Sequence, residues 1–294
     1  GSRKQVTVVA SMRDIKRRRD SIESTEQITR AMKLVSTAKL QKARERAEVS
    51  AAYTKLMYET ICSILGRRGN SDHRYQKTGT AGRKAVAAVT SNRGLAGGYN
   101  NNLIRLILND ERLSAEDTDI YAAGRKGLES LAGKGYTVKA DYSKAIDQPS
   151  YEEASRMAYE LLDAFSRGEV GEIYLACTFF KNTAVHVPKL IRLLPVDEPA
   201  EERDFRQQTA PINYEPDEDQ VLDVLIPQYI SGMIYGGLLE AAASENGARM
   251  TAMDSASNNA REMMGMLTLQ YNQARQNAIT QELTEIVAGA NAVG

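Results

Sequence analysis

Residues 245–293 read ENGARMTAMDSASNNAREMMGMLTLQYNQARQNAITQELTEIVAGANAV, and this stretch decides the fold. It belongs to a longer run, from about Asp217 to Ala290, in which only Pro227 interrupts a series of helix-forming residues. At about 1.5 Å per residue, a helix of about 75 residues would extend about 110 Å, which is too long to fold back into a compact domain. The sequence therefore predicts a shaft helix over residues 217–294.

Small and flexible side chains recur along this predicted helix at alternating steps of three and four residues. The series is Met253, Ala256, Ala260, Met263, Leu267, Tyr271, Ala274 and Ala278. Such spacing is typical of a coiled-coil seam, although a plain buried core stripe has the same period. The length of the run, and a second long stripe at the other terminus, favour an antiparallel coiled coil.

That second helix is predicted at the amino-terminal end, over residues 11–66. Neither proline nor glycine occurs between Ser11 and Leu65. The expected apolar stripe comprises Ile15, Ile22, Ile28, Met32 and Val35, with Arg17, Arg18, Arg19, Glu26 and Lys33 on the remaining surface. A stripe this narrow suits a single partner helix.

Between the two helices, residues 83–196 predict a small α/β domain. Apolar strands are expected from Ala85, Asp119, Tyr136 and Glu172, with helices between them over residues 101–108, 125–131 and 151–165. Residues 183–196, TAVHVPKLIRLLPV, alternate as an edge strand pair would, and the acidic residues 197–216 with three prolines predict a linker. The predicted fold class is α/β: a long antiparallel coiled coil of the terminal helices plus a central open, mainly parallel, Rossmann-like sheet.

Composition and isolated reactive residues argue against several functions. The 38 lysines and arginines balance 38 acidic residues, so the whole chain has no electrostatic bias toward nucleic acid or anionic lipid. The longest uncharged apolar run, residues 224–239, is shorter than the about 20 residues that span a bilayer. Cys62 and Cys177 are expected to be free thiols, and His73 and His186 have no partner at metal-ligand spacing. Neither a metal nor a cofactor is therefore expected.

Three glycines, Gly94, Gly97 and Gly98, lie between a predicted strand and a predicted helix, where backbone amides can cradle a phosphate. Neither a Gly-Lys-Ser/Thr triplet nor a GxGxxG at the first strand accompanies them, which favours a tight structural turn. Two other classes stay open. One is a nucleic-acid-binding protein that uses the basic residues 16–19, although aromatic residues do not interleave with them. The other is a hydrolytic or dehydrogenase domain with helical oligomerisation arms, although no nucleophile–base pair is evident.

Three stretches, in order, resemble the γ subunits of F-type ATP synthases. IKRRRDSIESTEQITRAMKLVSTAKLQKA from Ile15 resembles their amino-terminal signature, and residues 245–293 resemble their carboxy-terminal one. SNRGLAGGYNNNL from Ser91 is similar to their Gly-rich turn. Asn92 stands where the family usually has aspartate, a change that removes a possible charge pair from the turn.

The resemblance implies a central rotor stalk of bacterial type, which couples ion flow through a membrane ring to conformational cycling of the catalytic β subunits and has no catalytic site of its own. Implied partners are the α3β3 ring, the ε subunit and the membrane c-ring, with no nucleic acid and no cofactor. The implied location is the cytoplasmic face of the bacterial cell membrane.

The resemblance also implies contact residues at matching positions. Contacts with the β subunit are implied at Arg275, Gln276, Thr280, Glu282, Met32 and Arg249, and contacts of the foot with the membrane ring at Tyr214 and Glu215. Residues 287–294 carry no charged side chain, so this end of the helix is expected to be sheathed by other chains.

Overall fold

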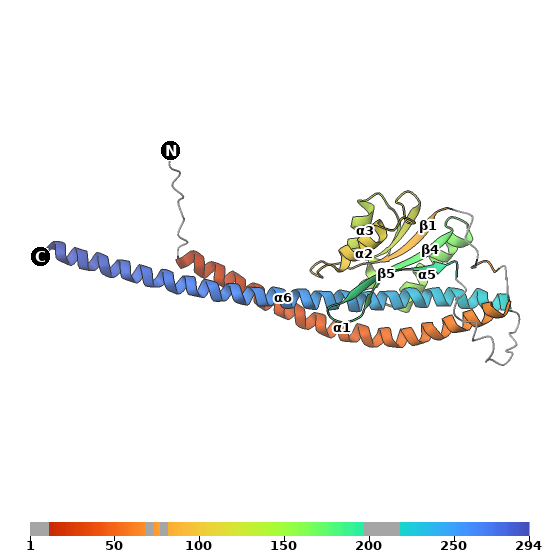
Figure 1. The fold of residues 1–294 in the computed structure, drawn as a ribbon, viewed down its shortest axis with the longest axis horizontal. Coiled ribbons are helices and arrows are strands. Elements are labelled where there is room, and N and C mark those ends of the chain that lie inside the picture. The colour runs from red at the N-terminus through yellow and green to blue at the C-terminus, as the bar shows by residue number, and fades with distance from the viewer. Residues whose placement is uncertain (1–11, 69–72, 77–81, 197–217, 294) are drawn as a thin grey trace. The chain divides into compact units, whose positions relative to one another are not determined.

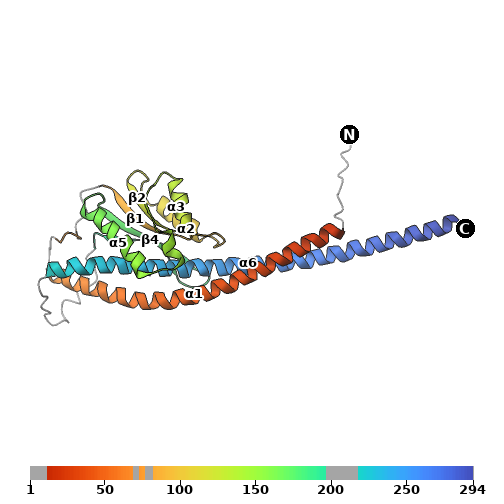
Figure 2. The same ribbon diagram turned by 180° about the vertical axis from the view of Figure 1, so that it is seen from behind.

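The computed structural model describes residues 12–68, 73–76, 82–196 and 218–293. Helix α1 (Met12–Arg68) precedes an α/β domain, and helix α6 (Glu218–Val293) follows it. The chain forms two compact units: unit 1 comprises residues 1–35 and 252–294, and unit 2 comprises residues 36–251. Within each unit, α1 and α6 run side by side in opposite directions (Figure 1 and Figure 2). The two predicted long helices and their antiparallel pairing are confirmed.

The α/β domain contains an open five-stranded sheet in the order β3–β2–β1–β4–β5. Its strands are β1 (Lys84–Val89), β2 (Thr118–Ala123), β3 (Thr137–Asp141), β4 (Glu172–Phe180) and β5 (His186–Leu194). Strands β1 to β4 are parallel and β5 is antiparallel to β4, so the predicted mainly parallel sheet is confirmed. The predicted strand pair over residues 183–196 is wrong. The Asn182 side chain accepts bonds from the amides of Ala184 and Val185 and forms a turn, so only the single strand β5 follows.

Helices cover both faces of the sheet. They are α2 (Tyr99–Leu108), α3 (Arg125–Ala132), α4 (Ser143–Asp147) and α5 (Tyr151–Ser166). Apolar residues of α2 and α3 pack against Val86, Ala88 and Ile120 on one face. Those of α5 and α6, with the carboxyl-terminal part of α1, pack against Ala87 and Leu175 on the other (Figure 1). Helix α6 is therefore part of the domain core as well as of the shaft.

The part of α6 that packs in the domain core has an apolar face. Leu222, Ile226, Ile230, Ile234 and Leu238 recur every four residues and are fully buried. The helix continues through Pro227 without ending. One apolar window of α6 has the length and composition of a membrane span, and half of that window is buried inside the protein, as in the core helix of a globular domain.

In unit 2, small residues let α1 and α6 approach closely. A Cβ atom added at Gly232 would lie 3.3 Å from Thr54 Oγ1, and one at Gly236 would lie 3.8 Å from Ser50 Oγ. Ala43 and Ala47 continue the buried face of α1 at steps of three and four residues. Small side chains on both helices therefore form a closely packed seam in this unit.

In unit 1 the predicted α1 stripe is partly wrong. Ile15 is buried, but Ile28 and Val35 are 58% and 56% exposed, whereas Glu26 and Thr29 are buried in their place. The seam follows alternating steps of three and four residues from Ile15, and both exposed residues fall outside that series. On α6, Met263 is likewise exposed, and Ser257 is buried in the seam.

Candidate functional site

The carboxyl-terminal part of α6 exposes an apolar face. Between residues 263 and 291 the charged side chains are Arg275, Glu282 and Glu285. Seven large apolar side chains in this part are exposed, and the four beyond residue 275 are Ile279, Leu283, Ile286 and Val287. At about 100° per residue, these four share one face of the helix, roughly 160° wide, with Arg275, Gln276, Thr280 and Glu282. We call these eight residues the tip face.

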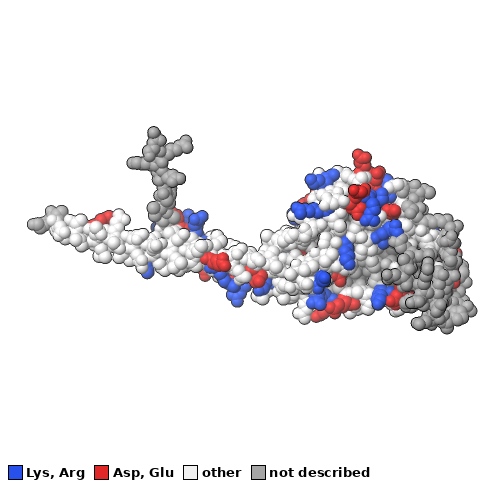
Figure 3. Space-filling view, viewed as in Figure 1, with Lys and Arg blue, Asp and Glu red and all other residues white. Residues whose placement is uncertain are grey.

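The tip face is turned away from the coiled-coil seam. Tyr271, Ala274 and Ala278, which were predicted in the seam, are half-buried and lie on the remaining side of α6. In the space-filling view, this end of α6 is largely free of charged side chains (Figure 3). The helix therefore presents a mainly apolar surface, on which Arg275 and Glu282 are the charged side chains, where a helix end in water would normally carry more charge.

The structure brings together four of the residues that the resemblance implied. Arg275, Gln276, Thr280 and Glu282 are all exposed on the tip face, and the Thr280 hydroxyl donates to the Gln276 carbonyl at 2.9 Å. Met32 lies elsewhere in unit 1, half-buried on α1. Tyr214 and Glu215 lie outside the described residues.

Arg249 is placed differently from these four. Its side chain is 12% exposed and forms an ion pair with Glu245, one turn earlier on α6, at 2.6 Å. Arg249 Nη2 also donates to the carbonyl of Gly94, at 3.3 Å. Burial raises the pKa of the Glu245 carboxyl above its usual value, and the Arg249 guanidinium opposes that shift. The arginine is therefore engaged inside unit 2.

A second charged cluster lies in the seam of unit 1. The Glu26 carboxylate accepts bonds from Arg261 Nη2 at 2.7 Å, Arg261 Nε at 3.0 Å and Ser257 Oγ at 3.2 Å. The hydrogen bond from Arg261 holds the pKa of Glu26 below its usual value. One heptad further along α1, Lys33 Nζ contacts Asp254 at 2.7 Å. These pairs explain why a glutamate could occupy a seam position that the sequence pattern placed on the surface.

Side-chain hydrogen bonds hold the Gly-rich turn that follows β1. Ser91 exchanges hydrogen bonds with Asn100, at 2.7 Å from Asn100 Nδ2 to Ser91 Oγ. Asn92 Oδ1 accepts from the Arg125 amide at 3.0 Å, and its Nδ2 donates to the Ser143 carbonyl and to Asp147. Asn92 therefore ties the turn to α3 and α4, and its amide group is used as both donor and acceptor.

This turn lies at the point where doubly wound sheets usually bind ligands, because the strand order reverses there and the carboxyl ends of β1 and β4 meet. In this chain α6 occupies that position. Glu240 Oε2 accepts from the Phe180 amide at 3.0 Å, and Ser244 Oγ donates to the Thr178 carbonyl at 3.0 Å. Further along, Thr251 Oγ1 donates to the Thr183 carbonyl at 3.1 Å. Sequence reasoning missed these contacts, because their one local sign is the presence of polar residues within an apolar helix.

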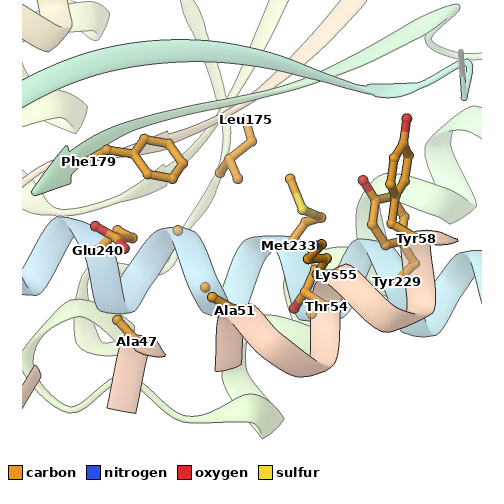
Figure 4. A pocket seen from close by; sticks show the side chains of 13 residues that line it. Ala47, Ala51, Thr54, Lys55, Tyr58, Leu175, Phe179, Tyr229, Met233 and Glu240 are labelled. Carbon is orange, nitrogen blue, oxygen red and sulfur yellow. The ribbon is translucent and has the colours of Figure 1, made fainter. Parts of the chain in front are cut away.

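A cavity of about 270 Å³ lies between α1, α6 and β4 (Figure 4). Its walls are mainly apolar, with Leu175, Phe179 and Met233, and with Tyr58 and Tyr229 stacked at 5.6 Å. Thr54, Lys55 and Glu240 also line it (Figure 4). Among the residues that the structure describes, no group of three or more potential ligands could hold a metal ion.

These features define a class of proteins with an open α/β sheet. The carboxyl ends of its strands, where such sheets usually bind ligands, pack against a terminal helix, and that helix continues into a coiled coil. A family model described as ATP synthase matches residues 11–293. The chain belongs to the ATP synthase gamma chain family.

Individual relatives agree with this assignment. The chain is 53% identical to the ATP synthase gamma chain of Lachnoclostridium phytofermentans over 291 residues, which cover 97% of this chain and all of the relative. It is 37% identical to the sodium ion specific ATP synthase gamma chain of Acetobacterium woodii, over 96% of this chain and 99% of the relative. A chain in the mitochondrial ATP synthase of Euglena gracilis (OSCP/F1/c-ring, rotational state 3) has the same fold, with a TM-score of 0.66 and 18% identity over 96% of this chain and 94% of that one.

Proposed function

We propose that this chain is the central rotor stalk of an F-type ATP synthase and that its tip face turns against the catalytic β subunits. The observation that carries the proposal is the tip face itself, with four exposed large apolar side chains on one side of a helix. Exposed apolar patches rimmed by polar groups mark protein–protein contacts. We take the partner to be the β subunit because the chain belongs to the ATP synthase gamma chain family.

The asymmetry of α6 supports a mechanism of coupling. The tip face and the seam lie on different sides of the helix, so three β subunits around it would each meet different side chains at any one angle. Contacts that differ between two conformations of a subunit shift the equilibrium between them. Rotation of the stalk would thereby change the nucleotide affinity of each β subunit in turn, while the bond-making chemistry stays in β.

The polar residues of the tip face suit this role. The Arg275 guanidinium can hold a carboxylate of β through two parallel hydrogen bonds, and the Gln276 amide can both donate and accept. The Thr280 hydroxyl donates its hydrogen bond to the Gln276 backbone carbonyl, so the lone pairs of the Thr280 oxygen can accept a hydrogen bond from a partner. Glu282 can accept from a cationic or amide group.

We place the remaining contacts by family membership. The α3β3 ring would enclose the tip, and the ε subunit and the c-ring would bind other parts of the chain, with Tyr214 and Glu215 proposed as contacts of the ring. In a bacterium, this assembly places the chain on the cytoplasmic face of the cell membrane. No catalytic or cofactor-binding residue is assigned to the chain, and nucleic acid is not proposed as a partner.

Co-expression with α and β subunits tests the proposal. We expect a stable α3β3γ complex with ATPase activity. In the complete ion-pumping enzyme, replacing both Arg275 and Gln276 with alanine should lower ATP-driven pumping about tenfold, because loss of an interface hot spot costs more than about 1 kcal/mol. Asn277→Ala is the matched control, because Asn277 is exposed on the same turn but lies outside the tip face. Equal pumping by the two variants would contradict the assigned contact.

A further inference from the structure

Helix α6 makes directional contacts with the α/β domain in addition to its apolar packing. The hydrogen bonds of Glu240, Ser244 and Thr251 to backbone groups at residues 178–183 all come from one side of α6, at steps of four and seven residues. A Cβ added at Gly247, on the same side, would lie 2.8 Å from His186 Cε1, so the helix backbone is close to the hairpin there. Contacts of this kind depend on direction, so they add to the restraint that apolar packing places on the rotation of the helix about its own axis.

The Arg249–Glu245 pair contacts the Gly-rich turn from another side of α6. The two side chains are 12% and 13% exposed, and the Arg249 guanidinium bridges the Glu245 carboxylate and the Gly94 carbonyl. A buried ion pair is costly unless both partners are satisfied, so each of the two requires the other. Both bonds come from one nitrogen, Nη2, which the planar guanidinium holds in a fixed direction, whereas the lysine ammonium is a point charge on a flexible stem.

The acceptor at Gly94 belongs to a rigid part of the domain. Ser91 and Asn100 close the turn around it, and Asn92 ties the turn to α3 and α4. The division between the two units falls between Thr251 and Ala252. Arg249 is therefore placed at the last turn of α6 that the α/β domain contacts before the helix enters unit 1.

We propose that Arg249 and Glu245 are positioning residues that lock the rotation of α6 to the α/β domain, so that torque passes between this domain and the tip. The inference rests on the proposed rotor function. It assigns Arg249 an internal role in coupling, exerted through the Gly94 turn. Its loss would let α6 turn or bend relative to the domain while the apolar core still holds the helix in place.

Amide hydrogen exchange in the full-length free chain tests the lock without reference to the rotor function. Arg249→Ala should accelerate exchange at residues 95–98 and 247–251 about tenfold or more, because the Glu245 carboxylate is left buried without its partner. Arg249→Lys keeps the charge but loses the planar guanidinium that holds the donor nitrogen in place, so a smaller acceleration is expected. The matched control is Arg167→Ala, which removes an exposed arginine paired with Asp163 one turn away on α5. Unchanged exchange in both Arg249 variants would overturn the lock.

The second measurement is the number of ions pumped per ATP hydrolysed by the assembled enzyme in vesicles. Arg249→Ala, and more weakly Arg249→Lys, should lower this ratio at least severalfold while hydrolysis continues, whereas Arg167→Ala should leave it unchanged. Faster exchange with an unchanged ratio would show a purely structural contact and would overturn the positioning role. Should Arg249→Ala fail to assemble, Arg249→Lys decides by the same two readouts. A wild-type chain that does not assemble with α and β would instead refute the proposed function, and with it the role in torque, while the exchange result would stand.

Discussion

The contact between Gly124 and Thr90 gives a prediction about the stability of unit 2. Gly124 follows β2 with a φ of 124°, and a Cβ added there would lie 2.2 Å from the Thr90 carbonyl oxygen. Thr90 cannot move aside easily, because its amide donates to Ala123 at 2.8 Å and its hydroxyl accepts from the Gly127 amide at 2.8 Å. Gly124→Ala therefore combines backbone strain with an overlap against fixed backbone atoms.

The expected cost follows from these two effects. A non-glycine residue held at such a φ costs about 1 to 3 kcal/mol, and overpacking of a well-packed site costs about 1 to 3 kcal/mol more. We expect Gly124→Ala to lower the free energy of unfolding by about 4 kcal/mol. Gly135→Ala is the matched control, because Gly135 has a φ of 90° but only Ala115 Cβ within reach, at 4.0 Å. That variant should lose only about 1 to 2 kcal/mol.

Urea unfolding followed by tyrosine fluorescence measures both variants. The chain has no tryptophan, and buried tyrosines of the α/β domain, among them Tyr99, Tyr136 and Tyr174, report on unit 2. Equal losses of stability in the two variants would refute the reasoning, because strain would then be the only cost and the overlap with Thr90 would be relieved at no expense.

Two further predictions concern titration. The pKa of Glu26 is lowered, so its bonds with Arg261 stabilise unit 1 fully at pH values above the usual glutamate pKa of 4.5, and this contribution is lost as the pH falls through the lower pKa of the folded state. The difference in melting temperature between wild type and Glu26→Gln should therefore shrink on acidification. A difference that stays constant from neutral to acidic pH would contradict this. Burial raises the pKa of Cys177 to about 12, and Cys62 is also buried. We therefore expect neither thiol to react with Ellman's reagent at neutral pH until the chain is denatured. A thiol that reacts at the rate of a free cysteine would argue against the packing described.

Much of the fold follows from periodicity in the sequence. Long runs without glycine or proline predicted α1 and α6, and short apolar runs separated by amphipathic helices predicted the mainly parallel sheet. The errors fall where tertiary contacts override the local pattern. Glu26 reads as a surface residue, yet Arg261, 235 positions away, satisfies its charge in the seam. Ile28 and Val35 read as core residues, yet they lie outside the series of seam positions.

The candidate functional residues also divide into those that the sequence pattern reveals and those that depend on contacts with distant parts of the chain. The tip face could be located from the sequence, because an uncharged helix end and the resemblance of Arg275 and Gln276 to family positions point to the same segment. The row from Glu240 to Thr251 could not, since its partners are backbone groups of β4 and the following hairpin, 60 or more positions away. Arg249 bonds to a carbonyl 155 positions away, a contact that no local spacing signals.

The charged pairs in the seam of unit 1 also govern how the two helices can slide along each other. In an antiparallel pair, a shift by one heptad in one direction would bring Glu26 opposite Asp254. A shift by one heptad in the other direction would bring Lys33 opposite Arg261. Either displacement replaces an attraction with a repulsion between like charges, in a part of the seam where little apolar area would favour any one alignment. In this central stalk, the charges of these four side chains therefore oppose sliding of α1 along α6.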